Sequence, residues 1–364
     1  LRMRSQRSDY DDDWHKTMVE FRARGSEMTG QGYAKGNPII IGVPSPWHIA
    51  DKLEALHVAG YHHVGLDIDP SFMVDSDVNR EVLRAFQLGD RDEVDGAVEK
   101  LARALVGEAW TERLLSIWRL SDQAVAATPE LSLYGGQGFV WYRFWVRPFV
   151  PDISKIPESD RAYYQDHMLS IFNNPHNVDF GADALWTIQG IAQSDEFVER
   201  FDTNVWGPLD AAIAEARAGI DVTDPGSAER VIFVATTDRL RAYKAYCRTL
   251  RNVSAWIAGV HGYLEAEDEQ TRVTRLDMVV EMVENELENT RDLLELWENS
   301  TVDFIPIAEA GETMHTYGSN FGELLRRKIE LMEQYGSHEP YIDPNYMWRI
   351  PEGSDIDEEE YLGY

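Results

Sequence analysis

The stretch 39-IIIGVPSPWHIADKLEALHVAGYHHVGLDIDP-70 decides the predicted fold of this chain. Residues 39–43 form a short apolar run rich in β-branched side chains, which is typical of a buried parallel strand. Residues 48–60 have the apolar spacing of an amphipathic helix and end at a glycine. Residues 61–68 have the pattern of a second strand. These lengths suit a parallel crossover, so the sequence predicts two adjacent parallel strands with a helix between them.

Helical patterns dominate the chain after about residue 76. Apolar residues recur at helical spacing over residues 77–89, 91–106, 109–127, 159–173, 181–193, 206–219, 226–263, 274–298 and 320–335. We therefore predict a mainly α fold, in which a short parallel β/α segment over residues 1–75 precedes a large helical domain over residues 76–349. The acidic tail, residues 350–364, is predicted to be poorly ordered.

Charge is the strongest feature of the composition. Asp and Glu number 64 against 34 Lys and Arg, which gives a formal net charge of −30. Nucleic acids and anionic membranes require a cationic surface, so the composition argues against both as partners. The composition fits an ordinary acidic soluble enzyme, and a salt-adapted protein, whose surface typically has many acids and few lysines, is the alternative.

Neither a membrane span nor a secretory leader is expected. No stretch has the roughly 20 apolar residues that a spanning helix needs, and the basic N-terminal residues are not followed by the apolar segment of a signal peptide. We therefore expect a soluble protein of unspecified compartment. Because a two-stranded parallel sheet does not stand alone, we expect a preceding region of a longer chain, or another polypeptide, to complete the sheet.

Three stretches resemble the end of a known enzyme architecture. Residues 42–70 look like the last two strands of a (β/α)8, or TIM-type, barrel. The stretch 77-DVNREVLRAFQLGDRDEVDGAVEKLARALVGE-108 resembles the segment after the barrel in glycoside hydrolases of the broad group related to the α-glucuronidase and β-hexosaminidase families. The stretch 284-ENELENTRDLLELW-297, continued by residues 311–332 and 339–348, is similar to the closing helices of members of that group.

The resemblance implies the terminal units of a TIM-type barrel followed by a helical C-terminal domain. By this analogy in fold, the substrate is an oligo- or polysaccharide and the reaction is glycosidic hydrolysis. In such enzymes the catalytic carboxylates usually lie on central barrel strands, which these stretches do not include. The chain would then contribute substrate contacts. A non-catalytic helical binding or assembly subunit, which completes its sheet with a partner chain, is the alternative.

Carboxylates follow the second predicted strand. Asp67 and Asp69 lie at its C-terminal end, where barrel enzymes place their sites. Their i, i+2 spacing of roughly 6.6 Å is compatible with the ~5–10 Å that separates a glycosidase pair. They are weak catalytic candidates, and the alternative is a pair of solvated or capping carboxylates. Trp47 and His48 follow the first strand and could stack on a sugar and bind a hydroxyl, or equally pack at the start of the helix.

An aromatic run interrupts the helical pattern. In 139-FVWYRFWVRPFVP-151, Trp141 and Trp145 could form a stacking platform, with Arg147 binding an acidic sugar. Such a run more often packs between domains, and we favour that interpretation. Trp141, Trp145 and Arg147 are therefore substrate-binding candidates that could instead pack between domains.

Glu312 and His315 form an E-x-x-H sequence, which can bind a metal when two copies face each other on helices. One copy is present and glycines flank it, so we predict a polar loop that contributes Glu312 and His315 to substrate binding, and no metal site. The alternative is structural hydrogen bonding. The chain has no phosphate loop, Rossmann fingerprint, G-x-S-x-G or cysteine pair, so no cofactor is expected. The single cysteine, Cys247, is predicted to be a buried thiol.

Overall fold

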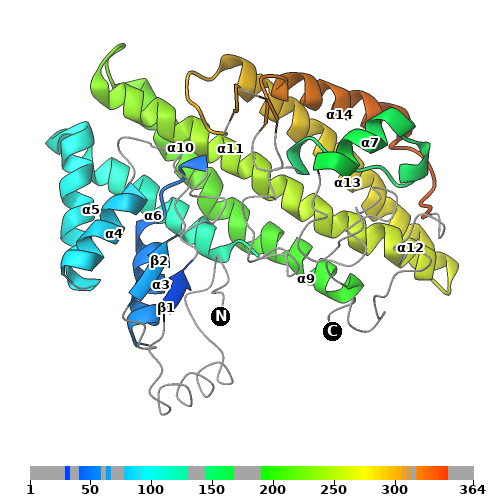
Figure 1. The fold of residues 1–364 in the computed structure, drawn as a ribbon, viewed down its shortest axis with the longest axis horizontal. Helices are drawn as coiled ribbons and strands as arrows, with labels where there is room; N and C mark the ends of the chain where they lie inside the picture. Colours follow the sequence, from blue (N-terminus) through cyan, green and yellow to red (C-terminus); the bar gives the residue numbers. More distant parts are fainter. Residues whose placement is uncertain are drawn as a thin grey trace.

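A computed structural model of the 364-residue chain describes most of its helical part. The described residues are 29–32, 41–58, 63–66, 78–89, 91–129, 144–167, 190–305, 307–309, 311–312 and 317–342. They form a long array of helices with one small sheet at one end (Figure 1).

The elements have the following bounds. The strands are β1 (Thr29–Gly32) and β2 (His63–Leu66). The earlier helices are α3 (Pro46–Val58), α4 (Val78–Leu88), α5 (Arg91–Val106), α6 (Thr111–Ala127) and α7 (Glu158–His167), with 3-10 helices η1 (Glu108–Trp110) and η3 (Ile153–Lys155). The later helices are α9 (Ile191–Arg200), α10 (Trp206–Val222), α11 (Ala228–Trp256), α12 (Gly262–Glu265), α13 (Glu269–Asn299) and α14 (Phe321–Tyr335). The π-helical segments η5 (Phe201–Val205) and η6 (Ile257–His261) join α9 to α10 and α11 to α12.

The sheet is not the end of a TIM-type barrel, and that part of the predicted fold is wrong. Within the described residues the sheet has two strands of four residues each, which pair in parallel with Thr29 opposite His63. The predicted strand at 39–43 is not extended where the structure describes it, because Ile41 is helical and Gly42 makes a turn with a φ of 77°. A short apolar run does not distinguish a buried strand from a buried helical segment. The partner of β2 is instead the glycine-rich β1.

The major helices form a row. α6 packs against α10, α10 against α11, α11 against α13, and α13 against α14, while α3 lies beside α4, α5 and α6 at the end that carries the sheet (Figure 1). One hydrophobic core runs along the whole row, from Ile41 to Met332. The described part of the chain is thus mainly helical.

The two longest helices have well-defined starts. Ser227 caps α11 by accepting a hydrogen bond from the backbone N–H of Arg230, and Asp268 caps α13 by accepting one from Thr271. Side-chain caps of this kind satisfy donors that the first helical turn leaves unpaired. Within the described residues, no helix is both long enough and apolar enough to cross a bilayer.

Candidate binding site

The residues predicted from the sequence as site candidates divide into two groups. Asp67, Asp69, Trp141 and His315 lie outside the residues that the structure describes. Trp47, His48, Trp145, Arg147 and Glu312 lie within it, in contact with different elements.

Trp47 and His48 lie in the first turn of α3. The indole N–H of Trp47 donates to Asp95 at 2.6 Å, and the guanidinium of Arg119 lies 5.5 Å from the ring centre. The backbone N–H of His48 donates to Asp122 at 2.9 Å. Burial, helped by nearby Lys52, lowers the pKa of His48 to about 3, so its ring is neutral at pH 7.

Trp145 and Arg147 are enclosed in the core. Trp145 as a residue is 1% exposed and Arg147 is 0% exposed. The Arg147 guanidinium lies 5.1 Å from the ring centre of Phe149, and the carbonyl of Trp145 accepts from Lys328 at 2.9 Å. A sugar reaches neither side chain in this conformation.

Glu312 accepts a hydrogen bond from the hydroxyl of Tyr163 on α7 at 2.7 Å. The structure therefore does not bring the described candidates into one cleft. Among the described residues, no group of three or more His, Cys, Asp and Glu side chains is placed to hold a metal ion.

A pocket lies elsewhere, between α10, α11 and α13 in the middle of the helix row. Its volume is about 240 Å³, less than the roughly 300–1,000 Å³ of sites for drug-sized ligands. The apolar part of its lining is Ile213 from α10, Ala245 from α11, and Leu293 and Leu296 from α13. These four side chains are buried, so a ligand of about the size of one sugar ring would find an apolar floor.

The polar lining is rich in cations. It comprises Asp210 and Arg217 from α10, Arg241, Lys244 and Arg248 from α11, and Asn289 and Asp292 from α13. Arg241, Lys244 and Arg248 share one face of α11, because residues three, four or seven apart lie on the same side of a helix.

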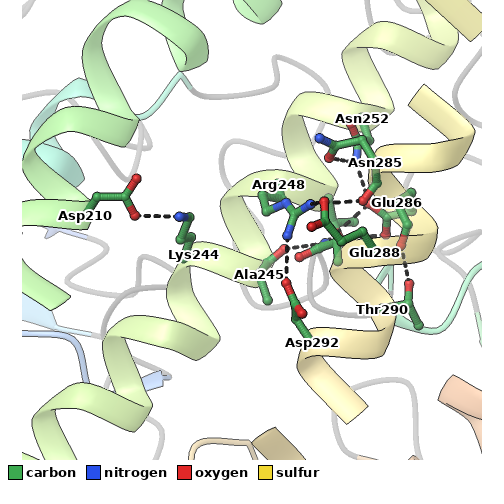
Figure 2. A network of polar contacts seen from close by, with 12 residues as sticks. Asp210, Lys244, Ala245, Arg248, Asn252, Asn285, Glu286, Glu288, Thr290 and Asp292 are labelled. Atoms are coloured by element: carbon green, nitrogen blue, oxygen red, sulfur yellow. Dashed lines mark hydrogen bonds and ion pairs between the residues drawn. The ribbon is translucent and has the colours of Figure 1, made fainter. Parts of the chain in front are cut away.

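The cations of the pocket differ in how well they are neutralised. Lys244 pairs with Asp210 at 2.5 Å, and Arg248 pairs with Asp292 at 3.0 Å (Figure 2). Arg248 also pairs with Glu288. By contrast, within the described part of the chain Arg241 pairs only with Asp238, at 3.9 Å.

Arg217 has no ion-pair partner among the residues that the structure describes. The pocket therefore offers one unneutralised guanidinium from α10 and one weakly neutralised guanidinium from α11.

Asn289 forms the inner wall of the pocket. Its side-chain amide nitrogen donates to the carbonyl of Ala245 at 2.9 Å and to the hydroxyl of Thr249 at 3.0 Å. These bonds orient the amide, and its Oδ1 atom is buried without a hydrogen-bond partner in the described part of the chain. An unpaired buried acceptor costs about 1–3 kcal/mol.

A buried ion pair lies behind Asn289. Glu286 accepts from Lys328 at 2.5 Å and from the hydroxyl of Thr249 at 2.8 Å, and both members of the ion pair are fully buried. Asn252 donates to the second carboxylate oxygen of Glu286 at 2.6 Å, as the close-up of this network shows (Figure 2). The network ties α11, α13 and α14 together and keeps Asn289 in place.

Sequence reasoning missed this pocket, although a signal was present. Arg241, Lys244 and Arg248 form a basic stripe at helical spacing in a strongly acidic chain. The stripe alone could not identify a site, because Arg217, Asn289 and the apolar floor come from two other helices that only the fold brings to it.

Comparison with known proteins shows a similarity in fold to a solved enzyme structure. No family model and no curated protein matches the sequence. Among solved structures, the chain is similar to a GH138 enzyme targeting pectin rhamnogalacturonan II, with a TM-score of 0.53 and 12% sequence identity. The match covers 91% of this chain and 42% of that one, so the chain spans less than half the length of the enzyme. At this identity the likeness concerns the fold alone.

Proposed function

We propose that the chain is the helical part of a carbohydrate-active protein and that it binds an oligosaccharide in the pocket between α10, α11 and α13. The pocket is the observation that carries the proposal, because it combines fixed polar groups with an apolar floor at the size of one sugar ring. The similarity in fold to a GH138 enzyme targeting pectin rhamnogalacturonan II supports it.

The lining of the pocket matches the surface of a sugar. A sugar ring presents C–H groups on its faces and hydroxyl groups around its edge. Leu293 and Leu296 suit the C–H face. The carboxylates of Asp210 and Asp292 at the pocket wall can accept hydrogen bonds from hydroxyl groups.

Binding can be tested with the whole chain by isothermal titration calorimetry against a panel of neutral and acidic oligosaccharides. The variant Ala245→Leu fills part of the pocket from within, so it should weaken binding at least tenfold. The matched control is Ala214→Leu on the exposed face of α10, which should bind like the unmodified protein. If no member of the panel binds, or if Ala245→Leu binds normally, the proposal fails.

A non-catalytic binding or assembly role is the second candidate. It is favoured by the coverage of the structural match, because more than half of the GH138 enzyme has no counterpart in this chain. Hydrolysis of aryl glycosides, with Asp67→Asn and Asp69→Asn variants as controls, separates the two. Hydrolysis by this chain that is lost in either variant would favour an enzyme over the binding role. The mass of the protein in solution then shows whether the chain assembles with itself.

A further inference from the structure

We propose that the pocket between α10, α11 and α13 selects a sugar or related polyol that carries one anionic group. The anionic group lies between Arg217 and Arg241, and the sugar or polyol part of the same ligand lies on the apolar floor of the pocket. This inference rests on the proposed function and narrows its ligand class.

The first argument is the charge of the lining. Four cations and two carboxylates line the pocket, in a chain whose formal net charge is −30. Lys244 and Arg248 are each held by a carboxylate at 3.0 Å or less. The surplus positive charge is therefore that of the other two cations, Arg217 and Arg241.

The second argument is the chemistry of those two side chains. Arg217 comes from α10 and Arg241 from α11, so the two side chains belong to different walls of the pocket. A guanidinium presents paired N–H donors that match carboxylate, sulfate or phosphate oxygens. An anionic group between them would be neutralised by two cations that the protein leaves without a close partner.

The third argument is independent of charge. The floor of the pocket is apolar, and the carboxylates of Asp210 and Asp292 at its wall can accept hydrogen bonds from hydroxyl groups. An inorganic anion gains nothing from an apolar floor. A ligand that carries an anionic group on a hydroxyl-bearing ring matches both the cations and the floor of the pocket.

The test is calorimetric titration of the full chain with matched ligands. Glucose is the neutral reference, and glucuronate, glucose 6-sulfate and glucose 6-phosphate distinguish a carboxylate from the two ester types. Inorganic sulfate and phosphate are titrated separately. We expect at least one charged sugar to bind roughly tenfold or more tightly than glucose, since hydrogen bonds to charged groups are the stronger ones.

Variants localise the effect. Arg217→Ala and Arg241→Ala should each remove most of the preference for the charged sugar while leaving the melting temperature unchanged. Arg272→Ala is the matched control, because Arg272 is an exposed arginine of α13 outside the pocket. It should leave the preference intact.

The outcomes separate this inference from the proposed function. If charged and neutral sugars bind alike and Arg217→Ala changes nothing, the inference fails while the proposed function stands. If no sugar binds, or if inorganic anions alone bind, both fail. A loss of preference of equal size in Arg272→Ala would indicate general attraction to the surface and would also overturn the inference.

Discussion

Lys328 shows how strongly one residue can depend on its environment. Its ammonium group is fully buried and donates to Glu286 and to the carbonyls of Phe144 and Trp145. Burial lowers the pKa of Lys328, and the adjacent carboxylate of Glu286 opposes that shift. A buried charge of this kind is tolerated because every part of it has a partner.

Removing the ammonium group of Lys328 should therefore strongly destabilise the folded protein. We expect Lys328→Met to lower the free energy of unfolding by about 3–5 kcal/mol, because Glu286 would remain buried without its counter-ion. Urea denaturation at pH 7 measures the change. Arg326→Met, which breaks an exposed pair with Glu298, is the control and should cost less than about 1 kcal/mol. Equal losses in the two variants would contradict the assigned role of the buried pair.

His48 predicts a pH dependence of stability. Its pKa is lowered to about 3 in the folded protein, whereas an unfolded histidine titrates near 6.5. Between these values the unfolded state holds a proton that the folded state does not, so stability is complete above pH 6.5 and is lost as the pH falls toward 3.

The size of the effect is measurable. For each pH unit below 6.5, protonation of His48 in the unfolded state should lower the free energy of unfolding by about 1.4 kcal/mol. His48→Gln should therefore lose roughly 2 kcal/mol less stability than the unmodified protein between pH 7.5 and pH 5, as measured by urea denaturation at both pH values. His57→Gln, an exposed position of the same helix, should leave the slope unchanged. Parallel slopes for His48→Gln and the unmodified protein would show that His48 is not held neutral.

At the scale of elements, the contact between α10 and α11 depends on a glycine. A Cβ atom at Gly219 would lie 2.6 Å from the ring of Phe233, which is itself fully buried. The two helices can approach this closely because α10 has no side chain at that point. The contact matters for the site, since α10 and α11 form two of the three walls of the pocket.

Substituting Gly219 at this contact should lower the stability of the folded protein. We expect Gly219→Ala to destabilise the protein by roughly 1–3 kcal/mol, because overpacking outweighs the higher helix propensity of alanine. Gly96→Ala in the interior of α5, where a Cβ atom meets nothing within 4 Å, should instead stabilise by about 1 kcal/mol. Thermal denaturation of both variants tests this, because the melting temperature should fall in Gly219→Ala and rise in Gly96→Ala. A stabilising Gly219→Ala would mean that the helices separate easily.

Some elements were predictable from the sequence and others were not. The range predicted at 91–106 coincides with α5 (Arg91–Val106), and 320–335 differs from α14 (Phe321–Tyr335) by one residue, since their apolar spacing is regular and their ends carry ordinary stop signals. The range 226–263 gave no sign of the π-helical segment η6 (Ile257–His261). The run at 39–43 was misread as a strand, because a buried helical segment can be equally apolar.

At the scale of the whole molecule, net charge opposes the compact state. The formal charge of the whole chain is −30, and several arginines of the described helices are already engaged in ion pairs. Screening weakens both the repulsion and the pairs. The repulsion should dominate, because exposed pairs contribute little each while the excess negative charge acts on the entire surface.

Stability should therefore rise with moderate salt. The screening length falls from about 30 Å to about 8 Å between 0.01 M and 0.15 M ionic strength, so the midpoint of urea unfolding should increase over this range. NaCl and KCl should act alike, since the effect is general screening. A midpoint that falls with salt would show that ion pairs, rather than net repulsion, set the balance.

The sequence by itself determined the helical character of most of the described chain, the bounds of α5 and α14 to within one residue, and the large negative charge. These are local or additive properties, readable from apolar spacing, breaker residues and composition. Only the tertiary structure decided that the sheet is two short strands rather than the end of a barrel, and that Trp145 and Arg147 are enclosed in the core. It also decided the pocket, because Arg217, Arg241 and Asn289 are far apart in the sequence and meet where three helices pack together.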